Sequence, residues 1–97
     1  MYCEEIETST HAKQKMTQRN ITSVDVFWIV ANGETIKEYT DTKPYPCRLL
    51  LGFIYDRPLH VVVARDDFDA KCHVITAYEP DRDIWHSDFK TKKIIEK

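Results

Sequence analysis

The first third of the chain carries hydrophobic residues at helical spacing. Within residues 10–19, Ala12 and Met16 stand four positions apart, as they would on one face of a helix. A hydroxyl side chain at any of positions 8–10 can accept a hydrogen bond from the first free backbone N–H groups. Asn20 tolerates the left-handed conformation that often ends a helix. The pattern therefore predicts a helix over residues 10–19.

The following segment predicts a second helix, which ends at Asn32–Gly33. Thr22 and Asp25 fit a capping box, and Ile21 and Val26 fit the hydrophobic staple that fixes how a chain enters a helix. Beyond the cap, apolar residues occupy two sets of positions: Val24, Phe27, Trp28 and Ala31, and between them Val26, Ile29 and Val30. Because this helix is apolar on nearly every side, we expect it to lie deep against a sheet.

Beyond the second helix the hydrophobic period becomes that of strands. The stretch "ETIKEYT" predicts an edge strand, and the two prolines of "TKPYPC" end it because proline cannot donate to a strand ladder. The apolar, β-branched segments "CRLLLGFIY" and "PLHVVVA" follow. We expect them to form a hairpin through Asp56–Arg57.

The last part of the chain adds a strand and a mixed tail. "DDFDA" predicts a turn, and "KCHVITAYEP" predicts the third long strand. The tail, "DRDIWHSDFKTKKIIEK", is consistent with a short edge strand or a helix around its apolar residues, Ile84, Trp85 and Phe89. It then becomes basic at Lys90, Lys92 and Lys93.

Element order and length together predict one α+β domain over residues 1–97. Two N-terminal helices are expected to pack on one face of an antiparallel sheet of three to five strands. The net charge of -2 gives no general attraction for nucleic acid, so we expect no DNA binding by the chain itself and any anion site to be a local patch.

The cysteines and the N-terminus bear on cellular location. Cys3, Cys47 and Cys72 are odd in number and form no C-x-x-C pair, which predicts free thiols in a reducing cytoplasm. No apolar run approaches the roughly 20 residues of a membrane span. "MYCEEIETST" carries acids where a signal peptide would be basic and then apolar. We therefore expect a cytoplasmic protein that does not enter the membrane.

Several polar residues stand out once the elements are placed. Strand alternation puts His60 on one face with Val62 and Ala64. By the same alternation Thr76 and Tyr78 share a face with Cys72 and Val74, and in a hairpin His60 would lie across from Thr76 or Tyr78. On the first helix, spacing by four gathers three basic side chains near one face: His11, Lys15 and Arg19.

Each of these residues also has a purely structural interpretation. A histidine in an apolar strand is typical of a hydrogen-bonded core residue, and Tyr78 before a proline can simply end its strand. Lys15 and Arg19 are equally consistent with a solvated helix face. No metal-binding spacing such as H-x-x-x-H or C-x-x-C occurs, so we expect neither a metal nor another cofactor.

Five short motifs follow one another in order along residues 10–90: "THAKQKMTQRNIT", "NGETIKEY", "KPYPCRLLLGF", "RPLHVVVA" and "VITAYEPDRDIWHSDFK". Together they resemble DUF4258, a prokaryotic domain family of unknown function, leaving 1–8 and 91–97 as terminal extensions. Lys15 stands where that family's pattern more often has arginine, which keeps the charge but loses the planar bidentate fork.

The resemblance implies a function, because such genes often neighbour a zinc-finger antitoxin of the YgiT type and the element order is similar to the RelE and MqsR mRNA interferases. It implies the toxin of a type II toxin–antitoxin pair, a metal-independent endoribonuclease with RNA as substrate and that zinc-finger antitoxin as partner. In such a site His60 would be the general base or acid and Tyr78 would orient or protonate the substrate. The phosphate would be held by the helix residues His11, Lys15 and Arg19, with Thr76 beside them.

Two other functions fit the same sequence. The chain is also consistent with a small protein-binding domain without activity, in which His11 and His60 belong to a structural hydrogen-bond cluster. A relative of the toxins that has lost activity is the third interpretation, and it is the one to which Lys15 in place of arginine points.

Overall fold

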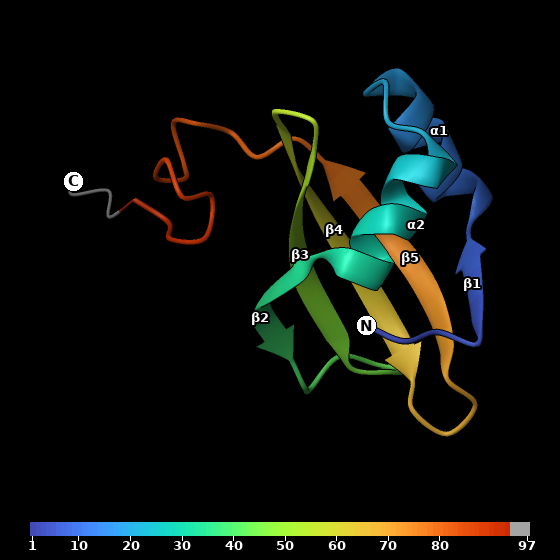
Figure 1. Ribbon diagram of the computed structural model, residues 1–97. Coiled ribbons are helices and arrows are strands. Elements are labelled where there is room, and N and C mark those ends of the chain that lie inside the picture. Colours follow the sequence, from blue (N-terminus) through green and yellow to red (C-terminus); the bar gives the residue numbers. More distant parts are fainter. Residues whose placement is uncertain (94–97) are drawn as a thin grey trace.

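The computed structural model describes residues 1–93, which form two helices and one five-stranded sheet (Figure 1). Along the sheet the strand order is β1-β5-β4-β3-β2. Helix α1 packs on β5, and α2 packs on β3 and β4. The predicted α+β class is therefore confirmed. The elements are β1 (Glu5–Thr8), α1 (Thr10–Gln18), α2 (Ser23–Asn32), β2 (Glu34–Tyr39), β3 (Cys47–Ile54), β4 (Arg57–Asp66) and β5 (Lys71–Tyr78).

The sheet is mixed, and the prediction of an antiparallel sheet was wrong in this respect. Strands β2 to β5 form the expected antiparallel meander, but β1 pairs with β5 in parallel, with Ile6 opposite Cys72. Strand β1 has only four residues, three of them polar, and it carried no strand signal of its own. It forms because the edge of β5 offers free backbone groups for pairing.

Both helices begin at the caps that the sequence offers. Ser9 accepts a hydrogen bond from the Ala12 N–H at 3.1 Å, and Thr22 accepts one from the Asp25 N–H at 3.1 Å. Asn20, just after the end of α1, has a φ of 57°, the left-handed conformation that was expected there. Local hydrogen bonding alone therefore sets the helix starts.

Helix α2 lies against the sheet, as expected, but buries only one side of its apolar surface. Val26, Ile29 and Val30 are fully buried, whereas Val24 is 75% exposed and Trp28 is 50% exposed. In a two-layer fold a helix has the sheet on one side and solvent on the other. Within residues 1–93, no second layer of the fold covers these outer apolar residues.

Two glycines let α2 approach the sheet closely. A Cβ on Gly52 would lie 2.5 Å from Cγ1 of Ile29, and one on Gly33 would lie 2.6 Å from the Ile29 carbonyl oxygen. No side chain fits at either contact. Gly33, with a φ of -70°, is therefore required for this close packing and not for a left-handed turn.

The strand registers differ from the expected ones at two points. Tyr55–Asp56 forms the hairpin turn between β3 and β4, one residue before the expected Asp56–Arg57, and Tyr55 has a φ of 56°. In β5 the pairing shifts between Val62 and Val63 of the neighbouring strand, so that Ile75 is an extra residue. Such a bulge reverses which face the following side chains point to.

The bulge corrects the predicted faces of β5. Cys72 and Val74 belong to the apolar cluster under the helices, as does Ala77. Thr76 and Tyr78 pair with Val62 and His60 and so lie on the opposite face. Simple alternation put Thr76 and Tyr78 on the same face as Cys72 and Val74, because it did not count the extra residue of the bulge.

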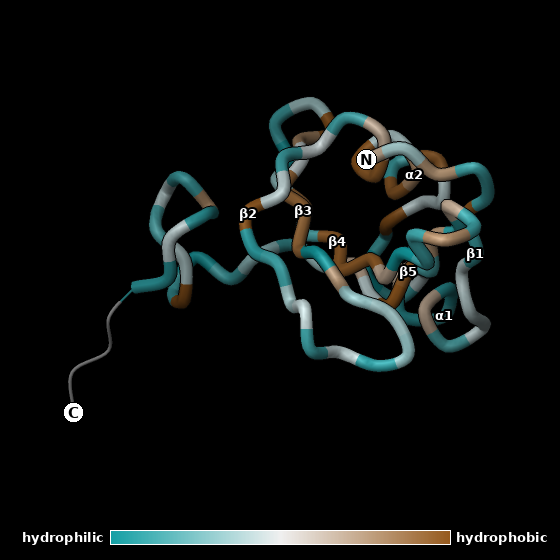
Figure 2. Tube along the Cα trace, turned by 90° about the horizontal axis from the view of Figure 1, so that it is seen from below, coloured by the Kyte–Doolittle hydropathy of each residue, from teal (hydrophilic) through white to brown (hydrophobic). Residues whose placement is uncertain are grey.

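The C-terminal segment, residues 81–93, covers part of the face away from the helices (Figures 1 and 2). It forms neither the expected edge strand nor a helix, but turns closed by an isolated bridge between Trp85 and Lys92. Trp85 and Phe89 are buried there against Leu49 and Leu51. Of the predicted C-terminal extension, residues 94–97 lie outside the described part of the chain.

Cys3 and Cys72 form a disulfide, which corrects the expectation of three free thiols. Their Cα atoms are 5.7 Å apart, because the parallel pairing of β1 with β5 brings the N-terminus alongside β5. Cys47 is free, as expected. Within residues 1–93, neither helix has the length and apolar character that a membrane crossing requires.

Candidate functional site

His60 lies in the middle of the sheet, on the face away from the helices, and its side chain is 0% exposed. It pairs directly with Tyr78 across β4 and β5, one of the two partners, Thr76 or Tyr78, that the sequence predicted. The His60 Nδ1 atom is 3.4 Å from the Tyr78 hydroxyl, and the ring centroids are 5.4 Å apart. The two side chains thus form one polar pair on this face of the sheet.

The C-terminal segment closes over the other side of the His60 ring. The Trp85 ring meets it edge-on, with centroids 4.6 Å apart and an interplanar angle of 89°. The His60 Nε2 atom lies 2.8 Å from the Phe89 carbonyl oxygen. Since a carbonyl can only accept, Nε2 carries the proton of the neutral ring and donates it. The lone pair of Nδ1 then faces Tyr78.

Burial controls the protonation of both partners. Burial lowers the pKa of His60, and the hydrogen bond to the Phe89 carbonyl opposes that change. Burial also raises the pKa of Tyr78; the Tyr39 hydroxyl acts in the same direction, while the Arg19 charge acts against it. At neutral pH the pair is therefore an uncharged imidazole beside an uncharged phenol.

Arg19 brings a positive charge to this end of β5. Its Nη1 atom donates to Thr76 Oγ1 at 3.2 Å and to the Ala77 carbonyl oxygen at 2.9 Å. Its remaining guanidinium N–H groups make no hydrogen bond with any residue in 1–93. Arg19 thus bonds to Thr76, two residues before Tyr78 on β5, while His60 contacts Tyr78.

Arg57 holds the end of α1 in this position, and the sequence analysis did not identify it. Its Nη1 and Nη2 atoms donate to the carbonyl oxygens of Asn20 and Arg19, each at 2.7 Å, and its Nε lies 3.1 Å from a Glu79 carboxylate oxygen. The two carbonyls lie at the end of the helix, where such groups lack partners within the helix. The available signal was an arginine directly after a hairpin turn, within "RPLHVVVA".

His11 and Lys15 are not brought to the His60–Tyr78 pair. His11 is exposed in the first turn of α1, about 12 Å along the helix axis from Arg19 at 1.5 Å per residue. Among the described residues neither side chain forms a hydrogen bond or an ion pair. Of the three basic residues expected to hold a phosphate, only Arg19 lies at the site.

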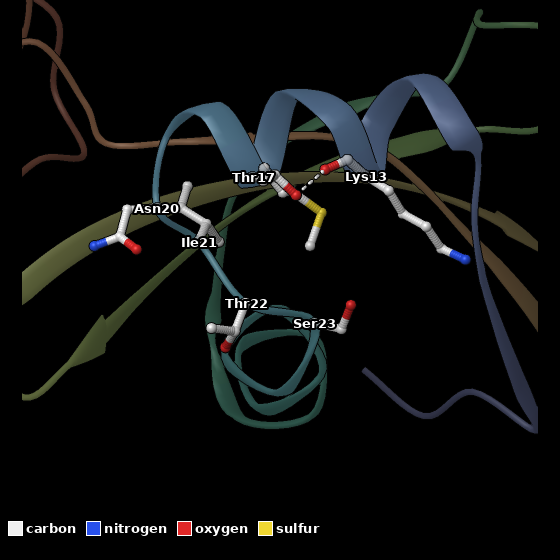
Figure 3. A pocket seen from close by; sticks show the side chains of 7 residues that line it. Lys13, Thr17, Asn20, Ile21, Thr22 and Ser23 are labelled. Carbon is white, nitrogen blue, oxygen red and sulfur yellow. Dashed lines mark hydrogen bonds between the residues drawn. The ribbon is translucent and has the colours of Figure 1, made fainter.

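A separate pocket of about 360 Å³ lies where α1 meets the start of α2 (Figure 3). Its hydroxyl groups serve the helices: Thr17 donates to the Lys13 carbonyl oxygen at 3.0 Å, and Thr22 caps α2. It does not include His60 or Tyr78. Within residues 1–93, no three histidine, cysteine, aspartate or glutamate side chains gather as metal ligands would.

Comparison with known families identifies most of the chain. The sequence profile described as "Domain of unknown function (DUF4258)" matches residues 8–79, from the end of β1 through β5 and past Tyr78. Neither a search of curated proteins nor a search of solved structures gave a match. The chain therefore belongs to the DUF4258 family.

Proposed function

We propose that this chain is a metal-independent endoribonuclease and the toxin of a type II toxin–antitoxin pair of the RelE and MqsR kind, restrained by a zinc-finger antitoxin. The observation that carries the proposal is that Arg19 bonds to Thr76 and Ala77 at the end of β5, directly before Tyr78 of the Tyr78–His60 pair. A cation beside a hydrogen-bonded phenol and imidazole is the set of groups that phosphodiester transfer requires.

RNA cleavage needs no nucleophile from the protein, because the 2′-hydroxyl attacks the adjacent phosphorus. The 2′-oxygen–phosphorus bond forms and the bond to the 5′-oxygen breaks, while one proton leaves the 2′-oxygen and one reaches the 5′-oxygen. In this proposal the Tyr78 oxygen accepts the 2′ proton as Tyr78 passes its own proton to His60 Nδ1. Water supplies the proton to the 5′-oxygen. The hydroxide that remains takes a proton from Tyr78 as His60 Nδ1 returns its own proton to the phenol, so both side chains end in their starting form. The Arg19 N–H groups that bond to no residue in 1–93 bind the phosphate oxygens.

This assignment changes the roles expected from the sequence. His60 is buried, so it acts through Tyr78 and does not touch the RNA. The raised pKa of Tyr78 suits this role, since the phenol exchanges protons without becoming a free phenolate. The 3.4 Å separation between Nδ1 and the hydroxyl is long, and such contacts shorten when substrate binds.

Purified full-length protein and labelled RNA test the proposal directly. We expect Tyr78→Phe and Arg19→Gln each to reduce the cleavage rate constant about 100-fold or more, the usual contribution of such groups. Tyr55→Phe is the matched control, because Tyr55 is 98% exposed at the β3–β4 turn. Lys13→Gln is the matched control on α1. Absence of cleavage by the wild type, or full activity of Tyr78→Phe, would contradict the proposal.

A protein-binding domain without activity is the second candidate, and the outer side of α2 favours it. Val24 and Trp28 stand one turn apart on that side and are 75% and 50% exposed. Paired expression separates the candidates. Growth arrest by the wild type that Tyr78→Phe abolishes supports the toxin, whereas unaffected growth together with intact RNA supports the binding domain.

A further inference from the structure

The backbone of the C-terminal segment determines where the proton of His60 lies. Nε2 faces the Phe89 carbonyl oxygen at 2.8 Å, and Nδ1 faces the Tyr78 hydroxyl at 3.4 Å. If the proton were on Nδ1, the lone pair of Nε2 would point at the carbonyl oxygen and both atoms would be acceptors. Only the tautomer with its proton on Nε2 satisfies both contacts.

The ring is also held against rotation. The Trp85 ring packs against the imidazole in a T-shaped arrangement, with the centroids 4.6 Å apart, and His60 is 0% exposed. The carbonyl is placed by an unusual backbone conformation, because Phe89 has a φ of 58° and its N–H donates to the His86 carbonyl oxygen at 2.9 Å. The tautomer thus depends on a turn far from β4 in the sequence.

We propose that the C-terminal segment is part of the reactive site, with the Phe89 carbonyl as a positioning group that fixes the His60 tautomer and so aims the Tyr78 hydroxyl. With the Nδ1 lone pair turned to Tyr78, the phenol donates its hydrogen to His60 and presents its oxygen lone pairs outward. The cleavage part of this inference rests on the proposed function. The tautomer is a property of the free protein and is tested without RNA.

The positive φ of Phe89 provides a matched pair of variants. Glycine adopts this conformation readily, so Phe89→Gly removes the ring and leaves the carbonyl in place. Proline is held near -65° and lacks an N–H, so Phe89→Pro removes the same ring and displaces the carbonyl. The two variants separate the backbone contact from the side-chain packing.

Nitrogen-15 NMR of histidine-labelled full-length protein reports which ring nitrogen of His60 is protonated. We expect a proton on Nε2 in the wild type and in Phe89→Gly, and a mixture of tautomers in Phe89→Pro. RNA cleavage should fall about 100-fold in Phe89→Pro and clearly less in Phe89→Gly, and the exposed Tyr55→Phe variant is the control that should keep the wild-type rate. If Phe89→Pro does not fold, Trp85→Ala tests the same step, because it frees the ring to rotate.

The outcomes separate the two proposals. A wild-type His60 protonated on Nδ1, or a Phe89→Pro variant with unchanged tautomer and cleavage, overturns the positioning role. A wild type with its proton on Nε2 that cleaves no RNA supports the tautomer assignment and overturns the ribonuclease function.

Discussion

The two faces of the sheet are covered in different ways. Toward the helices lies a continuous apolar cluster in which every fully buried side chain is apolar, such as Met16, Ile29 and Leu50. On the other face, Trp85 and Phe89 of an irregular segment shield a smaller cluster beside the buried His60. Side-chain volume determines how the first face packs, and hydrogen-bond geometry determines how the second is arranged. Substitutions on the two faces should therefore change stability in different ways.

The largest loss of stability is expected from opening the disulfide on the helix face. Cys3 and Cys72 are separated by 69 residues, and closing a loop of that length stabilises a protein by about 4 kcal/mol in the chain-entropy account. Cys3→Ser should lower the free energy of unfolding by about that amount, measured by urea denaturation. Cys47→Ser, which alters a free thiol, is the control. Equal midpoints for the two variants would refute the assignment.

A smaller loss is expected from the contact between α2 and the sheet. Ile29→Ala leaves a cavity at a fully buried position and should cost about 3 kcal/mol. Gly52→Ala should also destabilise, because its Cβ would lie 2.5 Å from Ile29 Cγ1. The double variant should lose less than the two single losses combined, since each change makes room for the other. Strict additivity in thermal unfolding would show that the two residues do not compete for the same space.

Features that depend on residues close together in the sequence were predicted, and features that depend on distant residues were missed. The predicted helix over residues 10–19 is found at Thr10–Gln18, because caps and spacing act within one turn. The His60–Tyr78 pair was predictable because a short hairpin joins their strands. Strand β1 and the disulfide were missed together, since each depends on a parallel partner more than 60 residues away, Lys71–Tyr78.

The rest of the candidate site was hidden for two physical reasons. The bulge at Ile75 reverses the faces of Thr76 and Tyr78, and nothing in "CHVITAYEP" marks an extra residue. Arg57 and His60 each also bond to backbone carbonyls, which every residue carries and no side-chain pattern reveals. His11, Lys15 and Arg19 follow the same spacing of four residues. Only Arg19, at the end of α1, bonds to Thr76 of β5.

The smallest effect is a pH dependence that only the His60 face should show. Burial lowers the pKa of His60 in the folded protein, whereas in the unfolded chain this histidine has a pKa near 6.5. As the pH falls below about 6.5, the unfolded chain therefore binds a proton at this position before the folded protein does. The contribution of His60 to the free energy of unfolding is complete above about pH 6.5 and falls as the pH drops toward the folded pKa, by at most about 1.4 kcal/mol per pH unit.

His60→Gln should remove this slope, whereas Ile29→Ala should lower the whole curve of stability against pH and leave its slope unchanged. Urea unfolding between about pH 7.5 and pH 5, above the range where carboxylates titrate, measures both. A wild type and a His60→Gln variant with parallel curves would show that His60 is not held neutral by its surroundings, and the contrast between the two faces would then be one of packing alone.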